Sequence, residues 1–531
     1  MTGSDTMAAP AGPLLTGATA RVSGTSATAR VLRRHLAAFG AEVTASDEDP
    51  HGLSAAAEVG FADGRRREIT VSWAGPVREP ALAGELDVQA VCGVMHVNGR
   101  RHGTARPLAV DYCATSAGVL AMIGLLASLR TEARESRVDT SVAEAGLLSV
   151  SQYLAAASAE DSEAVGLGTG GPPFVSADGV RFEIETLQPE PWAAFWNSLG
   201  AGVAAIRTGW RPFQFRYATA TAPLPDDLRR APLALPYAAI REIGARTGVS
   251  VCPVHTSSPP LPESPWQLEP TAGAARPSPA GTAASPLHGL AVLEAGRRIQ
   301  APLAAHLLRL LGTDVTRIEP PGGDPLRGMP PCAGGLSARW LALNRDKAAV
   351  ELDIKSPADR DRLRELAADA DVFLHNWAPG KAEELGLGAR DFPGGLVYAY
   401  TSGWADCDGP DLPPGTDFMV QARSGLSAVA GTDGAPSLMT VLDVLGGLLG
   451  AETIAAALLE RDRRGAGVAA ESSLFGAAAE LLRTGRAPAR PAPVLDVTED
   501  LSILPADPRM AAVIGRDAHG CPALHTPWRF S

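Results

Sequence analysis

The sequence contains one long internal repeat, and this repeat limits what the chain can fold into more than any other feature. The stretch at 89–145 aligns without a gap to a second copy at 421–477. The matched pairs include Gln89 with Gln421, Asp111 with Asp443 and Gly118 with Gly450. Nearer the start of each copy, FGAEVT at 39–44 matches LGTDVT at 311–316, and these two stretches lie closer together in the chain than the later pairs do. We therefore expect two related folding units in tandem, of which the first lacks about 60 residues.

Short apolar strands alternate with helices in the second copy. The expected strands are 290–293, 315–318, 350–352, 372–374 and 397–400, and the expected helices are 302–311 and 360–368. This alternation is typical of a parallel sheet with helices on its faces. The sequence thus predicts an α/β fold with two Rossmann-like parallel-sheet domains. Ligands of such sheets bind beyond the carboxyl ends of the strands.

Composition excludes several classes of function. The net charge of −12 disfavours nucleic acid and anionic membranes as partners. The first residues lack the basic and apolar parts of a signal peptide, and no apolar run reaches the roughly 18 residues of a membrane helix. The six cysteines are scattered, without the spacing of a disulfide framework or a metal centre. We expect a cytoplasmic protein that needs no metal.

Asp443 is the residue whose position most suggests chemistry. It follows the strand-like stretch LMTVL at 438–442 and precedes a long apolar helix, so we expect it at or near the helix N-cap. It can be a plain structural cap. Since a helix N-terminus also favours an ionised carboxylate, it can equally be a nucleophile toward a thioester. Gly446 and Gly447, one turn on, either leave room for a bulky thioester or let helices pack closely.

The second copy also carries a series of longer motifs. These are LAVLEAGRRIQAPLAAHLLRLLGTDVTRIEPPGGD, LNRDKAAVELDIKSP, ADVFLHNWAPGKAEELGLG, LVYAYTSGWADCDGPDLPPGTDFMVQARSG and VLDVLGGLLG. The ordered set, over 287–479, resembles the large domain of class III CoA-transferases of the CaiB/BaiF type. That family includes formyl-CoA transferases, carnitine CoA-transferases and α-methylacyl-CoA racemases. In the first copy, LAVDYCATSAGVLAMIGLLASLR resembles the region of the family's aspartate, and 174–256 resembles its small domain.

The resemblance implies a site and a mechanism. Asp443 falls on the family's catalytic aspartate, which implies attack on an acyl-CoA to give a mixed anhydride and then an aspartyl-CoA thioester. An acceptor carboxylic acid then takes the coenzyme A. Acyl-CoA is a substrate here, and no permanently bound cofactor is implied. The residues that fall on motifs lining the CoA or thioester site are Gln300, Ala301, Pro302, Lys347, Asn376, Trp377, Pro379 and Gly380.

The sequence departs from the family in three places. Some relatives have arginine where this chain has Pro320, and arginine commonly follows the motif lysine where this chain has Ala348. We expect Arg317 or Arg345 to supply the missing phosphate contact. The racemase members use a histidine where this chain has Thr416. Since threonine cannot shuttle a proton near neutral pH as histidine can, CoA transfer is favoured over racemisation.

The resemblance also divides the chain. The expected parts are a shortened first large domain at 14–160, a small domain at 165–260, a Pro/Ala/Gly-rich linker at 261–287, a full second large domain at 288–480, a second linker at 481–494 and a C-terminal segment at 495–531 that returns to a large domain. Family members form interlocked dimers. We therefore expect the two copies to form an internal pseudo-dimer, alone or as part of a further homodimer, in which the small domain serves the Asp443 site.

Asp111 matches Asp443 in the repeat, but the first copy has no counterpart of NRDK or NWAPG. We interpret it as a pseudo-site or a structural cap. Three functions remain open at this stage. They are a CoA-transferase acting between an acyl-CoA and a carboxylic acid, an acyl-CoA racemase or isomerase, and a degenerate acyl-CoA-binding protein without catalysis. The sequence identifies neither the donor acyl group nor the acceptor acid.

Overall fold

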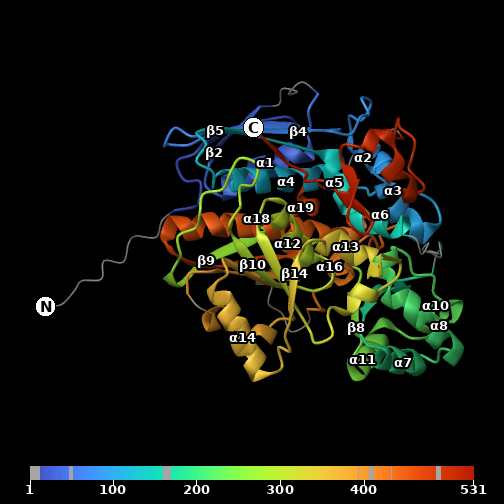
Figure 1. Ribbon diagram of the computed structural model, residues 1–531. Helices are drawn as coiled ribbons and strands as arrows, with labels where there is room; N and C mark the ends of the chain where they lie inside the picture. Colours follow the sequence, from blue (N-terminus) through green and yellow to red (C-terminus); the bar gives the residue numbers. More distant parts are fainter. Residues whose placement is uncertain are drawn as a thin grey trace.

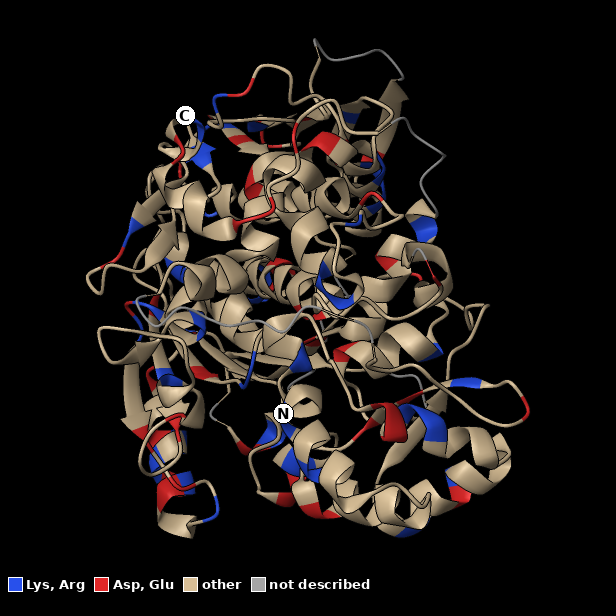
Figure 2. Ribbon diagram, turned by 90° about the vertical axis from the view of Figure 1, so that its right-hand side faces the viewer, with Lys and Arg blue, Asp and Glu red and all other residues tan. Residues whose placement is uncertain are grey.

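The structure is a computed structural model, and it describes residues 12–46, 52–159, 168, 170–392, 394–405, 412–431, 433–485 and 492–531. Two sheets lie one above the other with a layer of helices between them, and a small domain lies to one side of the second sheet (Figure 1). Segments rich in Lys and Arg are interspersed with segments rich in Asp and Glu over the face drawn in Figure 2. The predicted α/β class is confirmed.

The first unit is built around a six-stranded sheet of order β2-β1-β3-β4-β5-β20. Its elements are β1 (Thr19–Ser23), α1 (Ala27–Ala38), β2 (Glu42–Ser46), β3 (Ala55–Gly60), β4 (Arg66–Ser72), α2 (Glu85–Val91), α3 (Val94–Gly99), α4 (Tyr112–Ser128), β5 (Glu135–Ser141), α5 (Val142–Ser149) and α6 (Ser151–Ala157). The sheet is mixed, because β3 is antiparallel to both of its neighbours. In this respect the first sheet differs from the all-parallel sheet that we expected.

The second unit is built around a seven-stranded sheet of order β14-β11-β10-β15-β16-β17-β9. Its elements are β10 (Ala291–Ala295), α12 (Gln300–Leu310), β11 (Asp314–Glu319), β12 (Cys332–Ala333), β13 (Leu336–Ser337), α13 (Ala338–Asn344), β14 (Ala348–Glu351), α14 (Pro357–Ala368), β15 (Val372–His375), α15 (Lys381–Glu384), β16 (Val397–Ser402), α16 (Asp417–Arg423), α17 (Leu426–Ala430), α18 (Val441–Arg464), β17 (Ala466–Ser473) and α19 (Leu474–Thr484). All neighbours are parallel except β9, which runs antiparallel to β17.

The two sheets correspond strand by strand. Reading from β2 to β20 in the first and from β11 to β9 in the second, the six positions match in order. The second sheet then has one further strand, β14. The residues that the first unit lacks are those that build α13, β14, α14 and the parallel strand β15. In their place the first unit has only the antiparallel strand β3, joined directly to β4.

The edge strand of each sheet is supplied from elsewhere in the chain. β9 (Trp266–Ala274) adds to the second sheet, and β20 (Arg529–Phe530) at the end of the chain adds to the first. A Pro-Trp pair stands at the start of each strand, in SPWQL at 264–268, where Trp266 is the first residue of β9, and in TPWRF at 526–530, directly before β20. Arg529 pairs with Asp139, and Gln267 pairs with Glu471 at the matching position of the repeat.

This arrangement corrects the prediction that residues 261–287 are only a linker. Trp266 is buried and stacks on Phe39 of the first unit, with ring centroids 4.3 Å apart. Burial of a large aromatic side chain fixes the strand in spite of its Pro and Gly content. Pro270 is tolerated because β9 is an edge strand. Of the second expected linker, 481–494, residues 481–484 belong to α19, and residues 486–491 lie outside the described residues.

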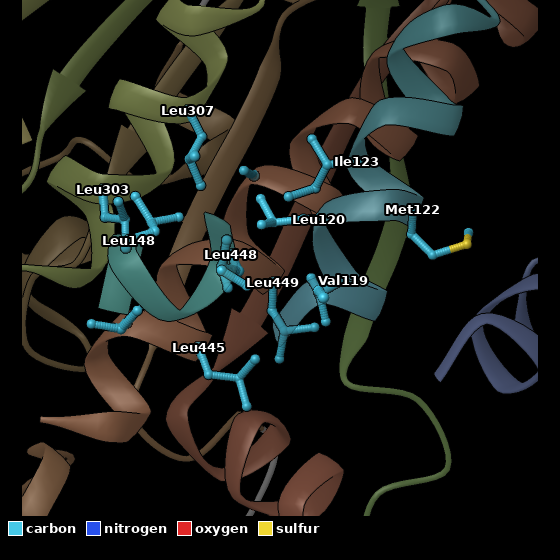
Figure 3. Close-up of a cluster of buried hydrophobic side chains, with 14 of the residues drawn as sticks. Val119, Leu120, Met122, Ile123, Leu148, Leu303, Leu307, Leu445, Leu448 and Leu449 are labelled. Carbon is cyan, nitrogen blue, oxygen red and sulfur yellow. The ribbon is translucent and has the colours of Figure 1, made fainter. Parts of the chain in front are cut away.

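The helices between the sheets form one continuous core. Every residue of α4 is buried, and α18 packs against it and against α12. Figure 3 shows apolar side chains of α4, α5, α12 and α18 meeting at this interface. By length and composition α18 could cross a membrane, but 94% of its most apolar window is buried inside the protein. It is the central helix of the core.

The small domain follows α6. It consists of the sheet β6-β7-β8, with β6 (Phe174–Val175), β7 (Arg181–Glu185) and β8 (Ser250–Pro253), and the helices α7 (Pro189–Ser198), α8 (Val203–Gln214), α9 (Arg216–Thr219), α10 (Asp226–Arg230) and α11 (Tyr237–Thr247). Its own core is aromatic, with Trp192, Trp196 and Phe213 buried together. The tail adds β18 (Ile514–Arg516) and β19 (Pro522–Leu524) before β20.

Candidate active site

Asp443 is the third residue of α18, and the stretch before it is not a strand. The helix begins at Val441, and its N-cap is Thr440, which has a left-handed backbone with φ of 55°. A β-branched residue rarely adopts this conformation, so the turn is strained. The Thr440 hydroxyl lies 3.4 Å from that of Tyr153 on α6. LMTVL was expected to be a strand, because a short apolar run does not distinguish a strand from a buried helix start.

A second carboxylate caps the start of α18. Asp417, the first residue of α16, accepts hydrogen bonds through Oδ2 from the backbone N–H groups of Leu442 (2.7 Å) and Asp443 (2.8 Å). Its Oδ1 accepts from the side-chain amide of Gln421. Gln421 in turn accepts from the backbone N–H of Ser437 at 2.8 Å. Asp417 therefore performs the capping that sequence analysis assigned to Asp443, and the Asp443 carboxylate is left for another role.

The electrostatics of the two carboxylates are coupled. Burial raises the pKa of Asp417 to about 6, although three N–H donors oppose the shift. The pKa of Asp443 is raised well above its ordinary value, first by burial, then by the negative charges of Asp417 and Glu185. Only the positive charge of Arg298 acts in the opposite direction. The site thus holds a carboxyl group that is hard to ionise, with one nearby cation that favours ionisation.

Asp443 lies at the carboxyl end of the second sheet, near its topological switch point. From β10 the chain continues to β11 on one side, whereas β15 lies on the other side. At this point Asn376, which follows β15, binds the turn that follows β10. Its side chain accepts from the backbone N–H of Arg297 and donates to the carbonyl oxygen of the same residue, both at 2.9 Å. Such a crevice is where open α/β sheets bind ligands.

The turn held by Asn376 carries two exposed arginines. Arg297 and Arg298 have no ion-pair partner among the described residues, and Arg298 has a left-handed backbone with φ of 61°. The Arg298 guanidinium lies 5.2 Å from the ring centre of Tyr217, a residue of α9 in the small domain. Sequence analysis missed both arginines. The signal was available, because they directly follow the first strand of a parallel sheet, where ligand-binding residues lie.

The small domain reaches the same place through a carboxylate. Glu185, the last residue of β7, accepts a hydrogen bond of 2.9 Å from the hydroxyl of Thr416. Arg216 of the small domain holds the same Glu185 oxygen at 3.3 Å. The Arg216 guanidinium also lies over the ring of Phe418, 4.7 Å from its centre. The turn before Asp417 is therefore fixed from the small domain.

Three of the predicted residues form the first turn of α12. Gln300, Ala301 and Pro302 are all buried, and the Gln300 amide donates to the carbonyl oxygen of Ser402 at 3.3 Å. The glycines of α18 pack against this turn. A Cβ on Gly447 would lie 2.9 Å from the backbone oxygen of Gln300, and one on Gly446 would lie 3.0 Å from the Gln300 amide nitrogen. Close helix packing, rather than space for a ligand, therefore accounts for both glycines.

Two of the cations predicted to lie at the CoA site, Arg317 and Lys347, are neutralised inside the protein. Arg317 donates to Glu294, Asn344 and other acceptors, including Asp324 at 2.9 Å. Lys347 donates to Glu294 and to the carbonyl of Pro302, both at 2.8 Å, and to Asn344 at 3.0 Å. All three donors of this ammonium group are used. The structure thus gives Arg317 and Lys347 a role in holding the second unit together, contrary to the expected contact with CoA.

The remaining predicted residues differ in exposure. Arg345 is buried and faces away from the switch point, toward the first unit and the tail. Trp377 is buried, and its carbonyl oxygen accepts from Tyr400 at 3.1 Å. Pro379 and Gly380 are exposed, and Gly380 has a φ of 73° before α15, as a Pro-Gly turn requires.

The matching position in the first unit has a different geometry. Asp111 is the N-cap of α4 and lies 3.6 Å from Arg30. The helix start is capped by Glu85, which accepts from the N–H groups of Cys113 (2.9 Å) and Ala114 (2.8 Å). Burial and the charge of Asp111 raise the pKa of Glu85 to about 7. Glu85 thus occupies the place of Asp417, but the described first sheet has no counterpart of Asn376, because the strand beside β1 is the antiparallel β3.

Comparison with known proteins gives one family and several relatives. A family model described as CoA-transferase family III matches residues 74–267 and 287–487, which is about three quarters of the chain. Succinyl-CoA:glutarate CoA-transferase of Mus musculus is 34% identical over 198 residues, covering 36% of this chain and 45% of that protein. Acetyl-CoA:oxalate CoA-transferase of Acetobacter aceti is 32% identical over 221 residues, covering 39% and 57%.

Among solved structures, a hypothetical protein (Rv3272) from Mycobacterium tuberculosis is 31% identical, with 38% of this chain and 57% of that chain covered and a TM-score of 0.34. The chain spans about half the length of the curated relatives it matches.

Proposed function

The chain belongs to CoA-transferase family III, and on that premise we propose that it transfers coenzyme A from an acyl-CoA to a carboxylic acid, with Asp443 as the nucleophile. The observation that carries the proposal is the place of Asp443. Its carboxylate lies at the start of α18 beside the switch point, while Asp417 accepts from the backbone N–H groups of Leu442 and Asp443 and so caps the helix in its place.

The proposed reaction is two exchanges through Asp443. An ionised oxygen of Asp443 attacks the thioester carbonyl carbon, the C–S bond breaks, and the CoA thiolate leaves a mixed anhydride. The thiolate then attacks the Asp443 carbonyl carbon and releases the donor as a carboxylate. The acceptor carboxylate attacks the resulting aspartyl-CoA thioester and regenerates an anhydride and a thiolate. Attack of this thiolate on the acceptor carbonyl gives the new acyl-CoA and frees Asp443. No proton or electron is gained overall.

Arg297 and Arg298 are proposed to supply the positive charge that this site needs. Both side chains are exposed on a turn that Asn376 holds by two hydrogen bonds, so their position is fixed while their charges remain available. Arg298 is the cation that favours the ionised form of Asp443. We propose that the Arg298 guanidinium binds the carboxylate of the acceptor. It also stabilises the negative oxygen that develops on the thioester carbonyl. Arg297 is proposed to bind the CoA phosphates.

We further propose that the two units act as an internal pseudo-dimer with one working site. The support is that Glu185 and Tyr217 of the small domain lie at the Asp443 site of the second unit. The exchanged edge strands β9 and β20 also join each unit to the other part of the chain. The described cysteines are free thiols, which fits work in a reducing compartment such as the cytoplasm.

The experiment is mass spectrometry of the intact protein after incubation with a panel of acyl-CoAs and hydroxylamine. We expect a hydroxamate on the wild type and on Asp111→Ala, and none on Asp443→Ala, because hydroxylamine traps the aspartyl thioester or anhydride. If every donor binds without forming an adduct, the proposal of covalent transfer is wrong. Exchange of solvent deuterium into the α-carbon, without CoA transfer, would identify an isomerase instead.

A further inference from the structure

A small cavity lies where the first unit, the second unit and the tail meet. Its walls come from α5 and α6 of the first unit, from α12 and the end of α13 with Arg345 in the second, and from Val513, Leu524, His525 and Pro527 of the tail. The volume is about 20 Å³, which is room for one or two groups the size of water. Two residues of α12 line it, His306 and Leu310, and the nearer of them to Gln300, His306, is six positions beyond it, about 9 Å further along the helix axis. The cavity is therefore separate from the Asp443 site.

Two buried polar groups in the cavity wall have no partner. Nη1 of Arg345 and Nδ1 of His306 are both buried and make no hydrogen bond with any described group. The other donors of Arg345 are used, since Nε donates to Leu341 and Nη2 to Pro522. Arg345 has no carboxylate within ion-pair distance among the described residues. Burial and the neighbouring cations, Arg345 first, hold the pKa of His306 well below its usual range. The negative charges of Asp517 and Asp346 act on Arg345, but neither carboxylate forms an ion pair with it, so Nη1 faces the cavity without a direct partner.

The carboxylate that does line the cavity is already neutralised. Glu144 binds Arg529 of the tail through both of its oxygens, at 2.5 and 3.0 Å, and one of them also accepts from Ser141 at 2.7 Å. Glu144 is therefore engaged elsewhere, and Asp517 and Asp346 act on Arg345 only from beyond ion-pair distance. An anion in the cavity would give Arg345 the direct partner that it lacks.

The internal repeat shows what the partner could be. The alignment of 39–44 with 311–316, extended toward the N-terminus, matches α12 with α1. The alignment of 89–145 with 421–477, extended by a few residues toward the C-terminus, matches α5 with the start of α19. The correspondence holds in three dimensions, since Ser141 and Ser473 cap the two helices in the same way. His306 then matches Arg34, and Leu148 matches Glu480. Leu148 lines the cavity and lies near α12 in Figure 3.

At the corresponding interface, a carboxylate fills the place that the cavity leaves open. Glu480 pairs with Arg34, with Arg483 at 3.3 Å and with the ring nitrogen Nε2 of His35 at 3.1 Å. The cavity has Leu148 where the repeat has Glu480, and His306 where it has Arg34, so it lacks the carboxylate that the repeat retains on the other side. Arg345, from the segment that the first unit lacks, adds a cation at this place. A negative group brought by a ligand would restore the same arrangement.

We propose that the cavity binds one small monovalent anion, of the size of chloride or formate, between Nη1 of Arg345 and Nδ1 of His306, and that this anion joins the two units and the tail. The size of the cavity excludes acyl-CoA and larger acids. The carboxylate in the wall, Glu144, is held by Arg529 and Ser141 and so does not provide a cage for a hydrated cation. The charge-assisted contact to Arg345 selects an anion over neutral water.

The direct test is a crystal of the whole protein soaked in bromide, which scatters anomalously and replaces chloride. We expect an anomalous peak between Arg345 and His306. A site that contains only water or nothing would overturn the proposal. This arm needs no variant, so it remains decisive even if a substitution prevents folding.

The second test is thermal unfolding with chloride and formate titrated separately, at constant ionic strength maintained with gluconate, which is too large for the cavity. We expect the wild-type Tm to rise and saturate, by about 2 °C at a hundredfold excess over Kd. Arg345→Gln should abolish the rise. Leu148→Glu should also abolish it, because its carboxylate occupies the place of the anion. An equal rise in all three proteins would refute the site, as would a bromide peak without a saturable rise, which would show binding at crystal concentration only.

Discussion

Substitution of Lys347 by methionine separates the two roles that sequence and structure assign to this lysine. The motif in which it lies predicts a contact with CoA, whereas the structure places it in the interior of the second unit. There its ammonium group donates to Glu294 and to the carbonyl of Pro302, both at 2.8 Å, and to Asn344 at 3.0 Å. Methionine keeps most of the side-chain volume but removes the charge and all three donors.

The expected cost follows from what is left behind. Removing one partner of a buried ion pair destabilises a protein by about 3–5 kcal/mol, mainly because the other charge stays buried. Here Arg317 still donates to the second oxygen of Glu294. We therefore expect the lower end of this range, about 3 kcal/mol, for Lys347→Met. Lys381→Met is the matched control, because Lys381 forms only a surface pair with Glu384, and it should change stability by less than about 0.5 kcal/mol.

The pH dependence gives a second, independent readout. Burial lowers the pKa of Lys347 to about 8, from an ordinary value of 10.5. Between these pH values the unfolded chain binds more protons at this group than the folded protein does, so its contribution to the free energy of unfolding rises with pH from 8 to 10.5. The stability difference between wild type and Lys347→Met should therefore widen across this window, because the variant lacks the group.

The assay combines urea unfolding with steady-state kinetics, at a temperature where the variant remains folded. We expect a lower unfolding midpoint, with a KM for acyl-CoA that changes by less than about threefold, since no CoA contact is lost. A variant as stable as Lys381→Met, but with a KM raised more than about tenfold, would show that Lys347 contacts the substrate and that its buried placement is wrong.

Two further predictions concern the active site and the helix beneath it. Arg298→Gln removes the cation that favours the ionised form of Asp443, so the pKa of Asp443 should rise and the acidic limb of the kcat/KM profile should move to higher pH. An unchanged profile would show that Arg298 does not act on the ionisation of Asp443. Gly447→Ala should cost about 1–3 kcal/mol of stability by overpacking α18 against α12, whereas Gly328→Ala, where an added Cβ meets nothing within 4 Å, should stay within about 0.5 kcal/mol in the same unfolding assay.

The regular elements of the second unit could be predicted because their signal is local. The expected strand 290–293 corresponds to β10 at Ala291–Ala295, and the expected helix 302–311 to α12 at Gln300–Leu310. The start of α18 could not be predicted in the same way. LMTVL is apolar and β-branched in part, so its pattern fits a strand. Only tertiary contacts, among them the Asp417 cap, place Thr440 in a left-handed turn and begin the helix at Val441.

The linker prediction failed for a related reason. The stretch at 262–286 is rich in Pro, Ala and Gly, and composition alone indicates a flexible connection. Instead, part of the stretch forms a strand, because Trp266 is buried against Phe39. Composition does not show this contact, because Phe39 is far away in the sequence. The repeated Pro-Trp pair, at Pro265 and Pro527, was the one sequence signal of a shared role.

The ion-pair partners of the arginines could not be predicted from the sequence either. Nothing in the sequence around Arg317 reveals that Glu294 and Asp324 neutralise it in the interior, since the pairing depends on how three strands and loops meet. By contrast, the exposed Arg297 and Arg298 stand directly after the first parallel strand. The topological rule alone could have selected them, because it depends on strand order and not on side-chain packing.

The deletion in the first unit explains why one chain with two aspartates should have one working site. A ligand crevice at a switch point needs two neighbouring parallel strands whose carboxyl ends meet at the same edge. The second sheet has β10 and β15 there, and Asn376 after β15 holds the turn after β10. The first sheet has β1 beside the antiparallel β3, so the residues that follow β3 lie at the opposite edge. Asp111 keeps its place at the start of α4, but the described part of the chain provides no partner loop to complete a crevice around it. We therefore expect selection for catalysis to act on Asp443, while the first unit is retained for the small domain and the helices that pack against α18.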